Sequence, residues 1–144
     1  MKKVLFIAVV SVVFCGLFNA CSESFSENLL VGEWICVEEA DYELTAKGWV
    51  AMDIDDLSGE DPFIWQFGLD GGYESYSVKT DGDIYSFDSG LYKYDEGGRT
   101  LTFVSGYGGR EYFFDVITLD KKDLIVIEGY SRSGIGSGLH FVRK

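Results

Sequence analysis

The stretch FIWQFGLDGGY, residues 63–73, decides the fold that this sequence predicts. Large apolar side chains stand at every second position of its first half, which is the period of a β-strand with one apolar face. These alternating residues are Phe63, Trp65, Phe67 and Leu69. The pair Asp70-Gly71 favours a tight hairpin, because both central residues of a type I′ turn need positive φ. The stretch therefore predicts a strand, a turn and the start of an antiparallel partner.

The same alternation of β-like runs and turn signals continues along the chain. The further runs are 30–38, 73–78, 84–94, 100–104, 112–119, 124–128 and 139–142. We expect bends at Gly90 and between Val116 and Leu119. Turn signals about every ten residues, with no covering helix, favour hairpins that close on themselves. The prediction is an all-β, antiparallel up-and-down barrel of about eight strands.

Two segments carry weaker patterns. A strand near Trp49 is doubtful, and residues 53–61 are expected to form an acidic loop. The glycine-rich run 134–138 lacks the lysine and the following helix that a phosphate-binding loop needs, so it is expected to be a flexible hairpin loop.

An aromatic interior follows from the strand periodicity. The residues expected on the inward face are Trp34, Phe63, Trp65, Phe67, Tyr92, Leu101, Phe103, Phe114 and Val116. An eight-stranded barrel has room only for its own side chains or for one small ligand. We expect these side chains to fill the interior or nearly fill it.

The N-terminus has the build of a secretory signal. Lys2 and Lys3 precede an apolar run, residues 4–14, that is too short to span a membrane, and Ala20 is a small residue before a cut. With Cys21 directly after it, the segment resembles a bacterial lipoprotein signal, which implies that Cys21 carries lipid. We expect a cleaved signal peptide (1–20), a lipidated tether (21–29) and one barrel domain (30–144) in an outer-membrane lipoprotein, on the periplasmic or cell-surface face.

The rest of the chain resembles a known family through an ordered series of short motifs. LVGEW at 30–34 contains the Gly-x-Trp of lipocalins, and FGLDGGY at 67–73 matches an aromatic strand running into Asp-Gly-x-Tyr. Gly90-Leu91-Tyr92 leads into a hairpin, and a polar turn splits the last apolar pair of strands. The series is similar to the small lipocalin-like domains of lipoproteins from Bacteroides-type bacteria. The resemblance implies a barrel with Trp34 plugging one end, and says little about a ligand.

Strong negative charge limits the partners of this chain. The net charge of −12 becomes about −14 without residues 1–20, which hold Lys2 and Lys3 and no acid. Such a charge argues against binding nucleic acid or anionic membrane surfaces. The acids serve solubility, or they dock a cationic partner or collect calcium. The densest acidic candidates for calcium are Asp53, Asp55 and Asp56.

The sequence offers little for catalysis. Cys36 would be the only thiol left in the mature domain besides Cys21, and its apolar neighbours indicate a buried, inert side chain. His140 is the single histidine, so zinc binding and a nucleophile–base–acid triad lack partners. We expect a protein that is not an enzyme and has no cofactor.

Two functional classes stay open. The first is a non-catalytic binding or interaction module for an envelope protein, with membrane contact through the lipid. The second is a carrier of a small apolar or amphipathic ligand inside the barrel. Its candidate contacts are Trp34, Trp65, Phe67, Tyr92 and Phe103. A cavity bordered by Trp65 and Tyr92 would favour the carrier, whereas a sealed core with exposed Tyr107 and Tyr130 would favour the interaction module.

Overall fold

The computed structural model describes residues 29–128 and 134–144, and these form nine antiparallel strands. The strands are β1 (Gly32–Thr45), β2 (Gly48–Asp56), β3 (Phe63–Phe67), β4 (Gly72–Val78), β5 (Ile84–Asp95), β6 (Thr100–Ser105), β7 (Glu111–Leu119), β8 (Asp123–Glu128) and β9 (Ile135–Arg143). The predicted signal peptide, Cys21 and the tether up to residue 28 lie outside the described residues. Within the described ranges, no helix is both long enough and apolar enough to cross a bilayer.

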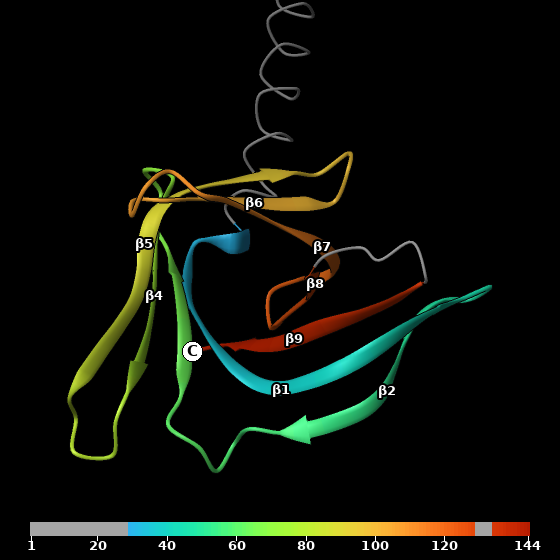
Figure 1. Ribbon diagram of the computed structural model, residues 1–144, viewed down its shortest axis with the longest axis horizontal. Helices are drawn as coiled ribbons and strands as arrows, with labels where there is room; N and C mark the ends of the chain where they lie inside the picture. The colour runs from blue at the N-terminus through green and yellow to red at the C-terminus, as the bar shows by residue number, and fades with distance from the viewer. Residues whose placement is uncertain (1–28, 129–133) are drawn as a thin grey trace, which may run out of the picture.

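β1 is the strand on which the barrel closes (Figure 1). One edge of β1 pairs with β9 from Trp34 to Glu43. The other edge is divided, because β3 pairs with its first residues and β2 pairs with it from Glu38 to Thr45. The ring therefore consists of β1 and β3 to β9, and β2 flanks it as the second half of a hairpin. This confirms the predicted antiparallel barrel of about eight strands.

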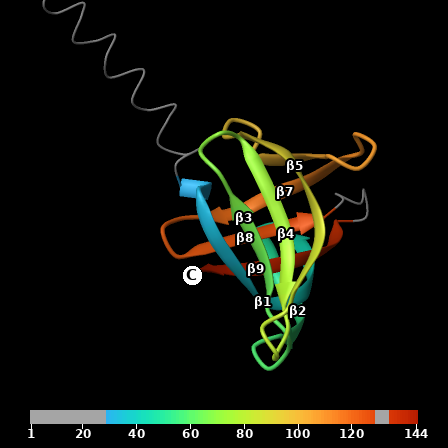
Figure 2. The ribbon, with the colours of Figure 1, turned by 90° about the vertical axis from the view of Figure 1, so that its left-hand side faces the viewer.

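Figure 2 shows how the ring is built, with β3, β4 and β5 crossing in front of β7, β8 and β9. The central strand of the sequence prediction is β3, in which Trp65 and Phe67 are buried as expected. Leu69 differs from the prediction, since its side chain is 81% exposed. The strand stops at Phe67 because the Gly68 N–H donates to the Gly72 carbonyl at 2.8 Å, which closes the turn two residues early.

Two segments expected to be loops are strands. Residues 53–56 belong to β2, because the long β1 offers them pairing partners as far as Glu38. β9 begins at Ile135 rather than Leu139, again because β1 extends to meet it. The glycines that suggested a loop make room for side chains: a Cβ on Gly138 would lie 2.5 Å from the Tyr42 ring.

The irregular positions of the strands are partly as predicted. The register of β7 shifts between Val116 and Thr118, which confirms the expected bend there. The bulge of β5 does not fall at Gly90, where pairing with β6 is regular. It falls at Phe87, because Asp88 pairs with Ser75 and Ser86 pairs with Tyr76. The Phe87 ring lies 5.6 Å from the Phe63 ring.

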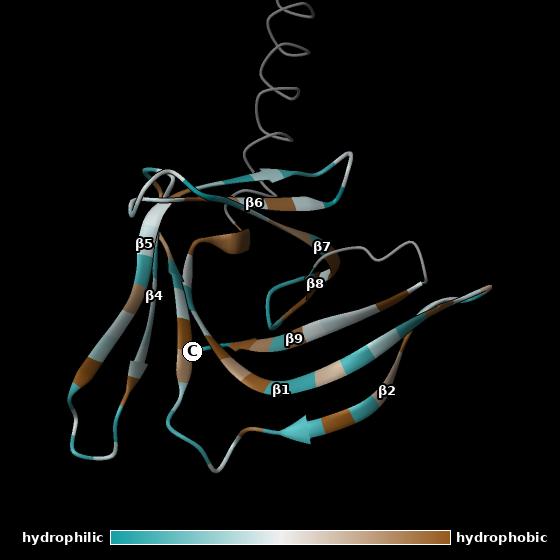
Figure 3. Cartoon of the chain, viewed as in Figure 1, coloured by the Kyte–Doolittle hydropathy of each residue, from teal (hydrophilic) through white to brown (hydrophobic). Residues whose placement is uncertain are grey.

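Aromatic rings fill the middle of the barrel. Trp65 stacks on Phe141 with ring centroids 4.3 Å apart, and it also contacts Phe103 at 5.0 Å. In the second half of β1, apolar residues alternate with acidic ones, as the bands in Figure 3 show, whereas its first half is continuously apolar from Trp34 to Val37. All nine residues predicted to face inward belong to this core or pack against it. The predicted inward face is therefore confirmed.

Candidate functional site

A small open pocket of about 110 Å³ lies beside the aromatic core. We call it the mouth pocket, and it is lined by Trp65, Tyr73, Ser75, Asp88, Phe103, Tyr112 and Phe114. The pocket exists because the first part of β5, before Gly90, has no pairing partner in β6. β6 pairs with β5 only from Gly90 to Asp95. A larger hollow of about 510 Å³ adjoins it, shares Asp88 and Tyr112, and is lined also by Arg110 and Tyr107.

Strand register brings the polar side chains of the pocket together. Asp88 of β5 pairs with Ser75 of β4, so both side chains lie on the same face of the sheet. Two residues further along β5, Gly90 pairs with Tyr73 of β4 on one side and with Ser105 of β6 on the other. Because side chains alternate between the faces of a strand, Asp88 shares the inward face with Gly90.

Asp88 is the centre of a hydrogen-bond network. The Tyr73 hydroxyl donates to Asp88 Oδ2 at 2.6 Å, and the Ser105 hydroxyl donates to Oδ1 at 2.7 Å. The Ser89 backbone N–H donates to Oδ1 at 2.9 Å. The Ser75 hydroxyl donates to the backbone carbonyl of Asp88 at 3.3 Å. Four donors thus fix the position of this residue.

These contacts keep the carboxyl of Asp88 ionised. Burial raises the pKa of Asp88, but the hydrogen bonds from Tyr73, Ser105 and Ser89 lower it by more, so the pKa lies below its ordinary value. The pKa of the Tyr73 hydroxyl is raised by burial and by its bond to Asp88. At neutral pH the pocket therefore holds a fixed negative charge beside a neutral phenol.

The five residues predicted to contact a ligand are divided by the structure. Trp65 and Phe103 line the mouth pocket. Phe67 is 1% exposed and lies in the core, and the Tyr92 hydroxyl donates to the Gly68 carbonyl at 3.0 Å, away from the pocket lining. Tyr107 is 74% exposed, while Tyr130 lies outside the described residues.

Trp34, the fifth of these residues, is completely buried where β1 begins. Its indole N–H donates to the Leu30 carbonyl at 2.7 Å. The guanidinium of Arg143 lies over the ring, 4.3 Å from its centroid, and donates to the backbone carbonyls of Val31 and Leu29. The indole thus closes this end of the barrel, as the resemblance implied, and offers no surface to a ligand.

Asp88 was not among the residues predicted to form a site. The signal for it was present, since Asp88 stands in step with Tyr92, which was expected to face inward. The Asp88 partners Tyr73 and Ser105 are far away in sequence, so only the register of three strands reveals the network.

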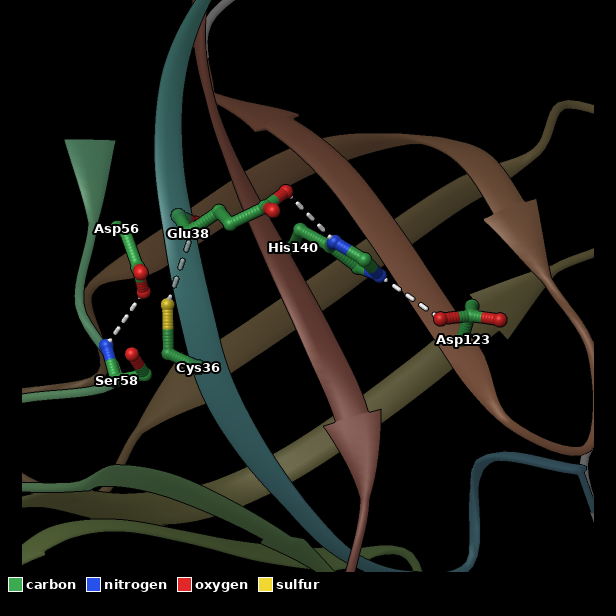
Figure 4. A network of polar contacts seen from close by, with 6 residues as sticks. All are labelled: Cys36, Glu38, Asp56, Ser58, Asp123 and His140. Atoms are coloured by element: carbon green, nitrogen blue, oxygen red, sulfur yellow. Dashed lines mark hydrogen bonds and ion pairs between the residues drawn. The ribbon is translucent and has the colours of Figure 1, made fainter. Parts of the chain in front are cut away.

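A second polar network surrounds His140 (Figure 4). Its Nδ1 lies 3.0 Å from Glu38 Oε2 on β1, and its Nε2 lies 2.8 Å from Asp123 Oδ1 on β8. A neutral ring would point one lone pair at a carboxylate, so the two contacts favour the doubly protonated ring. Burial lowers the pKa of His140, but the bonds to Glu38 and Asp123 raise it by more, and the pKa lies above its ordinary value. The ring ties three strands together.

The pH dependence of stability should report this His140 bridge. Because the folded-state pKa is raised, its contribution is complete below the unfolded pKa of about 6.5 and is lost as pH rises through the folded pKa. The two carboxylates are partly exposed, so we expect about 0.5–1 kcal/mol. Urea unfolding at several pH values between 5 and 8 should show this loss in the natural chain. His140→Gln should remove it, and an equal slope in both proteins would contradict the bridge.

The remaining candidate residues do not form a reactive centre. Cys36 is 3% exposed, its thiol contacts the Glu38 carbonyl, and burial raises the pKa of the thiol to about 11. The calcium candidates Asp53, Asp55 and Asp56 lie along β2. In the part of the chain that the structure describes, no group of three or more His, Cys, Asp or Glu side chains could hold a metal ion.

Comparison with known proteins gives matches in structure. No family model and no curated protein sequence matches the chain. A lipocalin-like protein from Bacteroides uniformis shares 17% identity over 81% of this chain and 99% of that one, with a TM-score of 0.54. An uncharacterized protein from Bacteroides eggerthii shares 16% identity over 80% and 99%, with a TM-score of 0.56. Such low identities speak for the fold alone: this chain is an antiparallel barrel with a lipocalin-like fold.

Proposed function

We propose that this protein is a non-catalytic binding module of the cell envelope that recognises its partner at the mouth pocket. A lipocalin-like fold suggests a binding module, and the observation that carries the proposal is Asp88. A carboxylate held by three donors in an aromatic pocket, with a fourth donor on the backbone carbonyl of the same residue, has a definite position and charge before any partner arrives. Such preorganisation lowers the entropic cost of binding.

The mouth is a better location for binding than the barrel interior. A carried lipid or sterol needs a pocket of roughly 300 Å³ or more. The mouth pocket has about 110 Å³, and stacked rings occupy the space behind it. The pocket therefore fits one inserted group, and the adjoining hollow of about 510 Å³ fits the part of the partner that carries that group.

A fragment screen by nuclear magnetic resonance tests this function. The panel should contain apolar, anionic and cationic fragments, together with fatty acids, haems and sterols. We expect bound fragments to shift the amide resonances of Tyr112 and Ser105 and the indole resonance of Trp65. The resonances of the buried strand residues Leu124 and Val126 should stay unchanged as a control. A panel that moves no resonance of the mouth pocket would refute the proposed function.

We also propose that the module is held on the outer membrane by lipid on Cys21. The support is the charged start, the short apolar run and the small residue before Cys21. Each buried CH₂ of an acyl chain contributes about 0.8 kcal/mol, so several chains hold a protein that one chain would not. Cys21→Ser should release the protein from membranes or leave the signal uncut. Membrane fractionation checks this, and normal cleavage with unchanged membrane association would contradict the anchor.

A further inference from the structure

We propose that the group bound in the mouth pocket is an organic ammonium, with Asp88 as its counter-ion and the surrounding aromatic rings as its walls. This inference rests on the proposed function and adds the chemical class of the ligand. Three observations support it: hydroxyl hydrogens are already donated to Asp88, acceptor lone pairs remain free for a ligand, and the pocket is small.

Three hydroxyl hydrogens in or beside the pocket are committed to Asp88. Tyr73 and Ser105 donate theirs to its carboxylate, and Ser75 donates to its backbone carbonyl. A hydroxyl that has given its hydrogen can only accept a further hydrogen bond. The Tyr112 hydroxyl can serve either role. What the network presents to a ligand is therefore mainly lone pairs, which select a hydrogen-bond donor.

Asp88 retains capacity for one more donor. A carboxylate offers about four lone-pair sites. Three are used, by Tyr73, Ser105 and the Ser89 N–H. An ammonium group brings three N–H donors, so it can bond the carboxylate and still reach a hydroxyl oxygen. Because Asp88 is ionised, the bond is charge-assisted, which makes it shorter and stronger than a neutral one.

The walls of the pocket also favour a cation. The rings of Trp65, Phe103 and Phe114 pack against one another, with centroids between 5.0 and 5.5 Å apart, and all three line the space. The face of an aromatic ring carries partial negative charge and attracts an ammonium group, most strongly for tryptophan. An anionic group would meet the Asp88 carboxylate and these ring faces with no compensating donor among the committed hydroxyls.

Size and surroundings narrow the ligand further. A volume of about 110 Å³ accepts an ammonium head with a short carbon chain and excludes a sterol or an acyl chain. Asp88 is the one acid among the residues that line the pocket, so a divalent metal would lack further carboxylate ligands. Arg110 lines the adjoining hollow, and its positive charge opposes entry of a cation. Arg110→Gln is therefore expected to strengthen binding.

Matched probes test the inference on the full chain. We would titrate n-butylammonium against n-butanol and 2-phenylethylammonium against 2-phenylethanol, which differ mainly in the charged nitrogen. Binding is read from the Trp65 indole resonance and from the ¹³C resonance of the Asp88 carboxyl. We expect each ammonium to bind at least tenfold more tightly than its alcohol. Asp88→Asn should abolish this preference, while Asp83→Asn, the same charge change on the exposed β4–β5 turn, should retain it.

The outcomes separate the two proposals. Equal binding of ammonium and alcohol in the mouth pocket would overturn the ammonium inference and leave the pocket as the binding site. Binding of only anionic or apolar fragments in the mouth pocket would also overturn the ammonium inference and leave the pocket as the binding site. Failure of every fragment at the pocket would overturn both. If Asp88→Asn does not fold, the comparison of each ammonium with its alcohol on the natural chain still decides, because equal affinities would refute the role of Asp88 as counter-ion.

Discussion

Replacement of Trp34 with alanine is expected to lower the free energy of unfolding by about 3–5 kcal/mol. The indole is 0% exposed and closes the barrel where β1 begins. Its removal leaves a cavity that the paired strands cannot collapse, because β1 is held by β3 and β9 on its two edges. It also leaves the Leu30 carbonyl without its indole donor and Arg143 without the ring beneath it.

Urea unfolding followed by circular dichroism measures this change. Tyr107→Ala is the matched control, since it removes another aromatic ring, one that is 74% exposed. The control should change stability by no more than about 0.5 kcal/mol. Trp34→Phe should give an intermediate loss, because it keeps a six-membered ring under Arg143 and removes the pyrrole part of the indole with its N–H. Equal stability of Trp34→Ala and the natural chain would remove the main support for Trp34 as the plug of the barrel.

The second large effect is expected for Gly90→Ala, at about 2–3 kcal/mol of destabilisation. A Cβ at this position would lie 2.1 Å from the Val104 carbonyl oxygen and 2.9 Å from the Gly106 nitrogen. Both atoms are backbone, so no side chain can rotate away. The only relief is to separate β5 from β6, which breaks pairs such as Gly90 with Ser105.

Gly59→Ala provides the control for Gly90→Ala. Nothing lies within 4 Å of a Cβ built on Gly59, so that change should be close to neutral. Thermal unfolding compares the two variants, and amide hydrogen exchange should show lost protection in β5 and β6 for Gly90→Ala alone. Because the Asp88 network spans β4, β5 and β6, the same variant should also disturb the mouth pocket. Equal melting temperatures for both variants would show that the strands can move apart at no cost.

The parts of this fold that sequence could predict are those set by local periodicity. The alternation in residues 63–67 and the inward set from Trp34 to Val116 depend only on the two-residue repeat of a strand. The bend near Ile117 was visible because the alternation of apolar residues shifts by one position between Val116 and Leu119. Each of these features involves residues close together in sequence, so the pattern itself carries the information.

Features that depend on pairing between distant strands could not be predicted. The true ends of β2 and β9 follow from the length of β1, and a run such as GIGSG resembles a loop until Tyr42 is seen to cover Gly138. The hydrogen-bond networks of Asp88 and His140 also depend on pairing between distant strands. Apart from Ser89, which is adjacent to Asp88, their partners lie between 13 and 102 residues away along the chain. Register alone makes them neighbours, and register is set by the closed ring.

The position of β2 outside the ring has a consequence for how copies of this protein behave at high density. In the described part of the chain, β2 pairs with β1 alone, so its outer edge is a template for another strand. The exposed apolar side chains of Val50, Met52 and Ile54 would favour association of β2 with a second strand. Asp53, Asp55 and Asp56 place negative charges along the same edge, where a second β2 would bring its own. The acidic run thus acts as a gatekeeper against edge-to-edge aggregation.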